Sequence, residues 1–369
     1  MNKIRVLIVD DAVVVRRIVA DALSGEPDIE VVGSAANGRI ALAKVPQLNP
    51  DVIILDVEMP EMDGLAALEE LRKTHPRLPV IMFSNLTLRG AAATLDALAL
   101  GATDYVTKPT HLRSTEEAIS LVRDSLVPRI RTFCDRSRPR SSSRSAAGPT
   151  RQKSQGPSRA QQRIDVVAIA VSTGGPNALA AVLPQLPRGF PVPIVIVQHM
   201  PPIFTKFLAD RLGAQSAIEI HEGAAGDIVK PGHAYLAPGD YHLLVERRGE
   251  TVRLATNQAP PENSCRPAGD VLFRSVAEVY REHSLGLVMT GMGRDGLRGC
   301  ERVHEAGGRV LVQDEATSIV WGMPGFVAHA GLAEKEIPVE GIAEALCQAV
   351  GFGRSWTSSA TSAKAGHGG

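Results

Sequence analysis

An apolar run that ends in a hydroxyl and two glycines constrains this chain more than any other feature. Residues Val166–Val171 are all aliphatic, and the segment S-T-G-G-P (172–176) follows directly. This pattern predicts a buried strand that turns sharply into a helix, with Ser172 at the carboxyl end of the strand, where open α/β sheets bind ligands. Two interpretations stay open at this stage. Ser172 is a nucleophile, or it caps a helix by accepting hydrogen bonds from unpaired backbone amides.

Length and composition limit the class of protein. At 369 residues the chain is too long for one ordinary domain, and 44% hydrophobic with 22% charged residues is normal for folded domains. No apolar run is long enough to span a membrane and no signal peptide is evident, so we expect a cytoplasmic protein without direct membrane insertion. Four cysteines lack C-x-x-C spacing, which indicates neither a zinc site nor a disulfide framework.

The charge is unevenly distributed although the net charge is zero. Residues 134–163 hold eight Arg and Lys residues against one acid, and they are rich in Ser, Pro and Gly with few aliphatics. Such a segment cannot bury enough surface to offset its ordering entropy, and no aromatic residues interleave it as in many nucleic-acid-binding segments. We therefore predict four regions: a first domain at 1–127, a basic disordered linker at 128–163, a second domain at 164–350 and a disordered tail at 351–369.

The first domain alternates short apolar runs with helical patterns, which predicts βαβ units and a parallel sheet. The predicted strands are Val6–Val9, Glu30–Gly33, Val52–Leu55, Val80–Phe83 and Asp104–Val106.

Polar residues follow these strands where each one ends. Asp10 and Asp11 follow the first strand, Asp56 the third, Ser84 the fourth and Lys108 the fifth. The carboxyl ends of parallel strands share one edge, so the five side chains should meet. Three carboxylates there would bind Mg²⁺, the central one could attack a phosphoryl group, and the hydroxyl and ammonium groups would hold its oxygens. Unrelated caps and turn acids explain any one of these residues but not all five.

Residues 4–125 resemble a response-regulator receiver domain. The resemblance rests on the paired acids at 10–11, on L-D-V-E-M-P-E-M-D-G-L around Asp56, on F-S-N-L-T around Ser84, and on Lys108-Pro109. It implies a flavodoxin-like fold, Mg²⁺ bound by the three acids, and Asp56 as phospho-acceptor for a chemotaxis histidine kinase.

The second domain repeats the βα pattern, and three candidate residues follow its strands. Ser172, His199 and Asp295 each lie after the carboxyl end of an apolar run, and they converge if those strands are neighbours. A nucleophile, a base and an orienting acid are what acyl transfer at neutral pH requires. The predicted strands are Val166–Val171, Ile194–Val197, Ala234–Leu236, Leu285–Thr290 and Val310–Gln313.

Other interpretations of these residues remain open at this point. His199 alone could be a structural histidine, and Asp295 in a glycine-rich loop could be a turn acid. The glycines after Ser172 could form a phosphate cradle, although the lysine of a P-loop and the spacing of G-x-G-x-x-G are both missing. The order Ser, His, Asp along the chain, without G-x-S-x-G, argues against the familiar serine-hydrolase scaffolds.

Residues 164–350 resemble the Rossmann-like catalytic domain of the chemotaxis protein-glutamate methylesterases. The shared segments are V-S-T-G-G-P, Q-H-M-P-P, P-G-H-A-Y-L-A-P-G-D-Y-H, D-V-L-F-R-S-V-A, T-G-M-G-R-D-G and W-G-M-P. The resemblance implies that Ser172 is the nucleophile, His199 the general base and Asp295 the acid that orients it. Thr173 and the backbone of Met292 fall where the family supports the oxyanion. The expected fold is thus two doubly wound parallel-sheet α/β domains joined by a disordered linker.

The resemblance also implies a function. It predicts a phosphorylation-regulated hydrolase that demethylates glutamate 5-O-methyl esters on the cytoplasmic domains of chemoreceptors, releases methanol, and deamidates receptor glutamines. We expect a monomer that needs no cofactor for ester hydrolysis, is recruited to receptor arrays at the inner membrane, and is covered at Ser172 by the unphosphorylated receiver domain. One alternative is a relative in a non-chemotactic pathway. Another is a DNA-binding response regulator, which requires a recognition helix in the second domain; we expect no nucleic-acid partner.

Overall fold

The computed structural model describes residues 3–109, 114–134 and 162–352. It divides into two compact units, residues 1–145 and 146–369, and each is described here by itself. Most of the predicted linker and tail, at 135–161 and 353–369, lies outside the described residues. Within the described residues no helix is long and apolar enough to cross a membrane.

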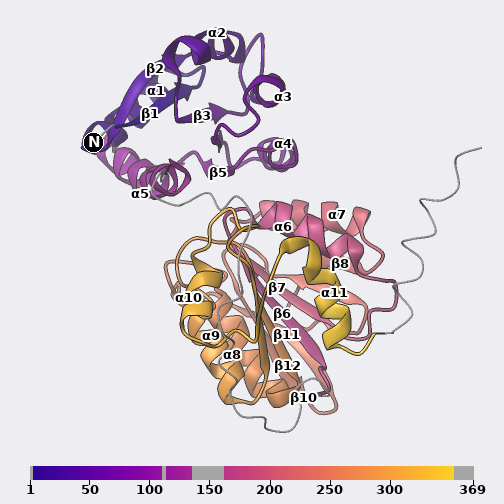
Figure 1. Cartoon of the computed structure of the whole chain (residues 1–369). Helices are drawn as coiled ribbons and strands as arrows, with labels where there is room; N and C mark the ends of the chain where they lie inside the picture. Colours follow the sequence, from indigo (N-terminus) through magenta and orange to yellow (C-terminus); the bar gives the residue numbers. More distant parts are fainter. Residues whose placement is uncertain (1–2, 110–113, 135–161, 353–369) are drawn as a thin grey trace, which may run out of the picture. The chain divides into compact units, whose positions relative to one another are not determined.

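The first unit is a five-stranded sheet with the order β2-β1-β3-β4-β5, and every pair is parallel (Figure 1). This is the flavodoxin-like order predicted from the sequence. Helices α1 and α5 pack together on one face, while α2, α3 and α4 follow one another along the other. The strands are β1 (Ile4–Val9), β2 (Ile29–Ala35), β3 (Val52–Asp56), β4 (Val80–Ser84) and β5 (Asp104–Thr107). The helices are α1 (Val13–Ser24), α2 (Gly38–Leu48), α3 (Gly64–Thr74), α4 (Leu88–Ala99) and α5 (Thr115–Cys134).

Helix α5 is longer than the sequence suggested. It continues through Pro128 to Cys134, so the predicted domain boundary at residue 127 falls within this helix. Leu126 and Ile130 lie on its buried face and pack against the core under α1. Burial of apolar side chains on both sides of the proline outweighs the backbone hydrogen bond that proline removes.

The second unit is built on a seven-stranded parallel sheet with the order β14-β13-β12-β6-β7-β9-β8. Figure 1 shows α8, α9 and α10 on one face of this sheet and α6, α7 and α11 on the other, in agreement with their contacts. The strands are β6 (Val166–Val171), β7 (Ile194–Gln198), β8 (Glu219–Glu222), β9 (His233–Leu236), β12 (Ser284–Val288), β13 (Arg309–Gln313) and β14 (Lys335–Ile337). The helices are α6 (Gly175–Val182), α7 (Phe204–Gln215), α8 (Gly269–Tyr280), α9 (Leu297–Glu305), α10 (Met323–His329) and α11 (Val339–Ala349).

Several strands of this unit were not predicted. The edge strands β8 and β14 have only four and three residues and are partly exposed, so they lack a strong apolar signal. β10 (His242–Arg248) and β11 (Thr251–Asn257) form an antiparallel hairpin outside the main sheet, and β10 packs on α8. β12 ends at Val288, two residues before its predicted end.

The topology places Ser172 at the centre of the sheet. From β6 the chain moves to β7 on one side, and it later returns to β12 on the other side of β6. The carboxyl end of β6 is therefore a switch point, where neighbouring connections leave on opposite faces and open a crevice. Ser172 follows β6 directly at this point.

Helices α8 and α9 approach closely because of Gly299. A Cβ atom at this position would lie 2.5 Å from Cβ of the fully buried Phe273 and 3.2 Å from Cα of Asp270. The close approach lets the amide of Gly299, in the first turn of α9, donate to Oδ1 of Asp270 at 2.7 Å. Asp270 thus satisfies an amide that α9 itself leaves unpaired.

We predict that Gly299→Ala lowers the free energy of unfolding of the second unit by about 1–3 kcal/mol. Alanine normally stabilises a helix relative to glycine. A lower free energy of unfolding in Gly299→Ala would therefore result from the steric clash with Phe273 and Asp270. Urea unfolding of the full chain measures it. Gly341→Ala in α11 is the matched control, because its nearest new contact is the Cγ2 methyl group of Ile337 at 3.3 Å. Equal stability of the two variants would contradict the prediction.

Candidate active site and phosphorylation site

The turn after β6 holds Ser172 in place through its backbone. The Ser172 amide donates to Thr290 O at 3.0 Å, and Ser172 O accepts from the amide of Gly175 at 2.7 Å and from Nε2 of Gln198 at 3.1 Å. Gly174, with φ of 77°, is the N-cap residue of α6, and no side chain caps this helix. The N-cap interpretation of Ser172 was therefore wrong, and its hydroxyl is not used for capping.

The end of β12 is tied to the same turn. Thr290 Oγ1 donates to Thr173 O at 2.9 Å, and it accepts the amide of Val320 at 3.1 Å. The Thr290 amide donates to Oε1 of Gln313 at the end of β13 at 2.9 Å. These contacts are buried and join the carboxyl ends of three strands into one rigid edge. Neither Thr290 nor Gln313 was singled out from the sequence, since nothing local marks their long-range partners.

His199 and Asp295 form the closest side-chain pair at this edge. His199 follows β7, and its Nε2 lies 2.7 Å from Oδ2 of Asp295, which is only 2% exposed. The carboxylate also accepts the amides of Gly269 and Asp270, at 2.5 and 3.0 Å, which begin α8. A helix N-terminus favours a negative charge, so the geometry stabilises an ionised Asp295.

The surroundings shift the pKa values of the pair in opposite directions. Burial disfavours both charged forms, but for Asp295 the hydrogen bonds from His199 and from two amides outweigh it and hold the pKa below its ordinary value. For His199, burial is again the largest influence, but the hydrogen bond to Asp295 and the contact with Cys265 together raise the pKa above its ordinary value. An imidazole with this partner is a strong proton acceptor.

The predicted contact between Ser172 and His199 is not formed. Among the described residues, no hydrogen bond joins the Ser172 hydroxyl to the imidazole, and Nδ1 instead lies 3.5 Å from Sγ of Cys265. Because Nε2 faces a carboxylate, we assign its proton to Nε2 and the lone pair of the neutral ring to Nδ1. The sequence thus predicted the histidine–aspartate pair, whereas Cys265 at the basic nitrogen was not foreseen.

The loop that carries Met292 is held by the W-G-M-P segment. Gly291 O accepts the amides of Gly322 and Met323 at 3.2 and 2.8 Å. A Cβ at Gly322 would come within 2.7 Å of Gly291 O, so only glycine allows this approach. The Met292 amide makes no hydrogen bond within the described part of the chain, and Thr173, the other predicted oxyanion residue, is 4% exposed.

Arg266 contacts one carboxylate and two backbone carbonyls of neighbouring loops. Its guanidinium binds Oδ1 of Asp240 through Nε and Nη2, at 3.0 and 2.5 Å, and its Nη1 donates to the carbonyls of Gln258 and Ala259. These contacts hold together the loops that flank the site.

In the first unit, the three predicted acids are brought together. Oxygen atoms of Asp10, Asp11 and Asp56 all lie within 4.8 Å of one another. Nζ of Lys108 lies 2.7 Å from Asp10 Oδ2 and 2.8 Å from Asp56 Oδ2. The hydroxyl of Ser84 is buried and lies within hydrogen-bonding distance of the carbonyls of Asn85 and Gly90, so it currently faces the start of α4.

The electrostatics of this acid cluster favour a cation. Burial, together with the negative charge of Asp10, raises the pKa of Asp56 to about 6 although the ammonium of Lys108 opposes the shift. One lysine does not neutralise three neighbouring carboxylates, and the oxygen donor set is the one that Mg²⁺ prefers. The residues present therefore fit a bound Mg²⁺.

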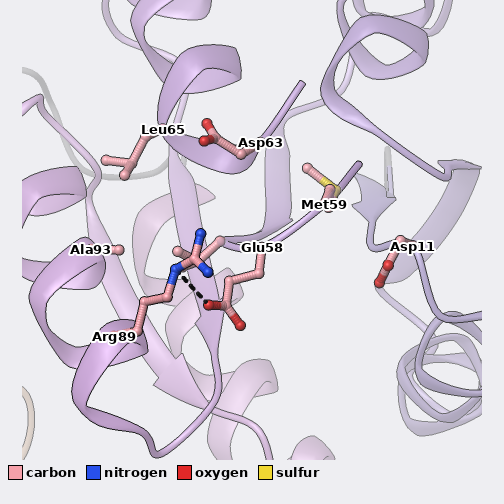
Figure 2. Close-up of a pocket in the computed structure, with 8 residues that line it drawn as sticks. Asp11, Glu58, Met59, Asp63, Leu65, Arg89 and Ala93 are labelled. Carbon is pink, nitrogen blue, oxygen red and sulfur yellow. Dashed lines mark ion pairs between the residues drawn. The ribbon is translucent and has the colours of Figure 1, made fainter. Parts of the chain in front are cut away.

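A cavity of about 410 Å³ opens beside the cluster. Figure 2 shows Asp11 on one side of it, with Arg89 of α4 and Glu58 of the loop after β3 on the other. Nε of Arg89 lies 3.3 Å from Oε1 of Glu58, and both side chains are substantially exposed. Asp11 is the member of the acid cluster that lines this cavity.

Comparison with known proteins assigns both domains to protein families. The family model for CheB methylesterase matches residues 167–346, and that for the response regulator receiver domain matches residues 6–120. A protein-glutamate methylesterase/protein-glutamine glutaminase of Trichodesmium erythraeum is 54% identical over 354 residues, which cover 95% of this chain and 100% of the relative. A protein of the same name from Nocardioides is 48% identical and covers 92% and 93% of the two chains.

Among solved structures, the CheB methylesterase catalytic domain of Thermotoga maritima is 42% identical, with a TM-score of 0.49 and coverage of 50% of this chain and 97% of that domain. Two matched domains in succession, together with relatives that match nearly end to end, lead to one conclusion: the chain belongs to the protein-glutamate methylesterase/protein-glutamine glutaminase family, with an N-terminal receiver domain.

Proposed function

We propose that this protein hydrolyses glutamate 5-O-methyl esters on the cytoplasmic domains of chemoreceptors, releases methanol, and also deamidates receptor glutamines. The proposal is carried by the buried His199–Asp295 pair beside Ser172 at the switch point of the sheet. The names of the relatives support the substrate class. A DNA-binding output is set aside, because the described second unit is a parallel α/β sheet that matches the methylesterase model.

The proposed mechanism begins when substrate entry brings Nδ1 of His199 to the Ser172 hydroxyl in place of Cys265. Catalytic hydrogen bonds often tighten only in the substrate complex. Ser172 Oγ attacks the ester carbonyl while Nδ1 takes the hydroxyl proton, and Asp295 stabilises the imidazolium. The Met292 amide and Thr173 stabilise the oxyanion. The proton then passes to the departing methanol, and water hydrolyses the acyl-enzyme with the same base. With a glutamine substrate, ammonia leaves instead.

Replacing the nucleophile tests this mechanism. Ser172→Ala should lower kcat for methanol release from methylated receptor by several orders of magnitude, because the triad acts as a unit. Thermal unfolding should be unchanged, since the backbone makes all of the Ser172 contacts described above. Methanol release at the wild-type rate would refute the assignment.

The pH dependence of the reaction provides a second test. His199 must be neutral to accept a proton, so kcat/KM should fall as the pH drops through its pKa. Since Asp295 raises that pKa, the acid limb should lie above 6.5, the ordinary value for histidine. Asp295→Asn removes the negative charge, which should move the limb to lower pH and reduce the maximal rate. Profiles of methanol release measure both effects, and a wild-type limb below 6.5 would contradict the prediction.

We further propose that phosphorylation of Asp56 by a chemotaxis histidine kinase activates the hydrolase, and that receptor binding recruits it to arrays at the inner membrane. Asp10, Asp11 and Asp56 would hold Mg²⁺, which when bound neutralises the carboxylates and the entering phosphoryl group. Lys108 is already 2.8 Å from Asp56 and would bind a phosphoryl oxygen, and Ser84 would turn from its carbonyl partners to bind another.

Regulation can be tested on the full chain. Acetyl phosphate with Mg²⁺ should increase methanol release by the wild-type protein and leave Asp56→Asn unstimulated, because the acceptor carboxylate is missing. Asp124→Asn, which alters an exposed acid of α5, is the matched control and should respond like wild type. Stimulation of Asp56→Asn to the wild-type level would contradict the proposed phosphorylation site.

A further inference from the structure

A short turn contacts both members of the histidine–aspartate pair. Glu262 and Cys265 exchange backbone hydrogen bonds of 3.1 and 2.9 Å, and the two residues between them have φ values of 52° and 62°. Two central residues with positive φ are typical of a type I′ turn, in which asparagine is favoured. The turn directs the Asn263 side chain towards Asp295 and places Sγ of Cys265 beside His199.

The Asn263 amide bridges two buried carboxylates. Its Nδ2 donates to Oδ1 of Asp295 at 3.0 Å and to Oδ2 of Asp270 at 2.8 Å, which uses both of its hydrogens. Asp295 and Asp270 are 2% and 1% exposed, whereas Asn263 is itself exposed beside a cavity of about 180 Å³. The amide therefore covers the acids on the solvent side.

Two neighbouring carboxylates repel each other unless donors lie between them. Asp295 has to stay ionised and keep its orientation, because its Oδ2 accepts the hydrogen bond from Nε2 of His199. Its other oxygen is held by the Asp270 amide and by Asn263. Loss of the Asn263 amide would leave one donor on Oδ1 and would admit water from the cavity between the two acids. A small rotation of a catalytic group is enough to slow a reaction strongly.

We propose that Asn263 is a positioning residue for the reaction: its side-chain amide fixes the Asp295 carboxylate against Asp270 so that Oδ2 stays aligned with His199. This inference rests on the proposed roles of His199 and Asp295. The charged and titratable groups around the bridge are His199, Asp240, His242, Glu262, Cys265, Arg266, Asp270, Arg274, Arg294, Asp295, Arg298 and Glu301.

Two substitutions separate the amide from the backbone of the turn. Asn263→Gly removes the amide and keeps the left-handed backbone, and it should lower kcat for methanol release by roughly tenfold to a hundredfold with little change in KM. Asn263→Asp keeps the shape, but it can bridge the acids only while a proton is shared among them. The kcat of this variant should therefore fall as the pH rises. We expect no such alkaline limb in the pH profile of wild type. Ser264→Gly is the matched control, because it alters the same turn without removing the bridge.

A second measurement does not depend on activity. The pKa of the His199 imidazole, followed by NMR in the full chain, should fall in Asn263→Gly towards the ordinary value and stay unchanged in Ser264→Gly. A residue that only supported folding would change the unfolding midpoint and not this pKa. Should Asn263→Gly not fold, the alkaline limb of Asn263→Asp decides the matter.

The outcomes distinguish this inference from the proposed function. If Ser172→Ala abolishes methanol release while Asn263→Gly stays within twofold of wild type with an unchanged His199 pKa, the positioning role is overturned and the proposed function stands. If Ser172→Ala keeps full activity, the proposed function fails, and the His199 pKa still decides whether Asn263 orients the pair.

Discussion

The buried negative charge of Asp295 organises the functional edge of the second unit. A carboxylate with 2% exposure is stable only if hydrogen-bond donors replace the water it has lost. Here the donors come from separate elements: the first amides of α8, the side chain of Asn263 and the imidazole after β7. Each donor reaches Asp295 only when its own element is correctly packed. The packing of α8 against the sheet edge and the chemistry of the site therefore depend on each other.

The two units use the same architecture with opposite charge balance. Both gather polar residues at the carboxyl edge of a parallel sheet. In the first unit three acids lie together and one lysine contacts two of them, and burial, together with the negative charge of Asp10, raises the pKa of Asp56. In the second unit one acid is surrounded by donors, and its pKa falls. The acid cluster of the first unit suits a cation and an anionic group that binds after it. The carboxylate of the second unit provides a fixed negative charge next to the imidazole.

The contact between Cys265 and Nδ1 places a thiol at the nitrogen of His199 that, in the proposed mechanism, accepts the proton of Ser172. Ser172 is fixed by backbone contacts to β12 and Gln198, and the imidazole is fixed at Nε2 by Asp295. The proposed mechanism therefore requires the imidazole to exchange the thiol for the hydroxyl as the partner of Nδ1.

The sequence by itself determined the central strands of both sheets and the residues that follow them, because aliphatic runs and strand ends are local patterns. It did not determine the short edge strands, the hairpin β10–β11 or the length of α5, whose apolar residues are stabilised by distant partners. Within the site, the sequence indicated that Ser172, His199 and Asp295 follow strands of one sheet, whereas it did not indicate the partner of each imidazole nitrogen or the bridge made by Asn263. The two imidazole contacts and the contact of Asn263 with Asp295 join residues 32 to 96 positions apart, and only the folded backbone sets distances at the scale of a hydrogen bond.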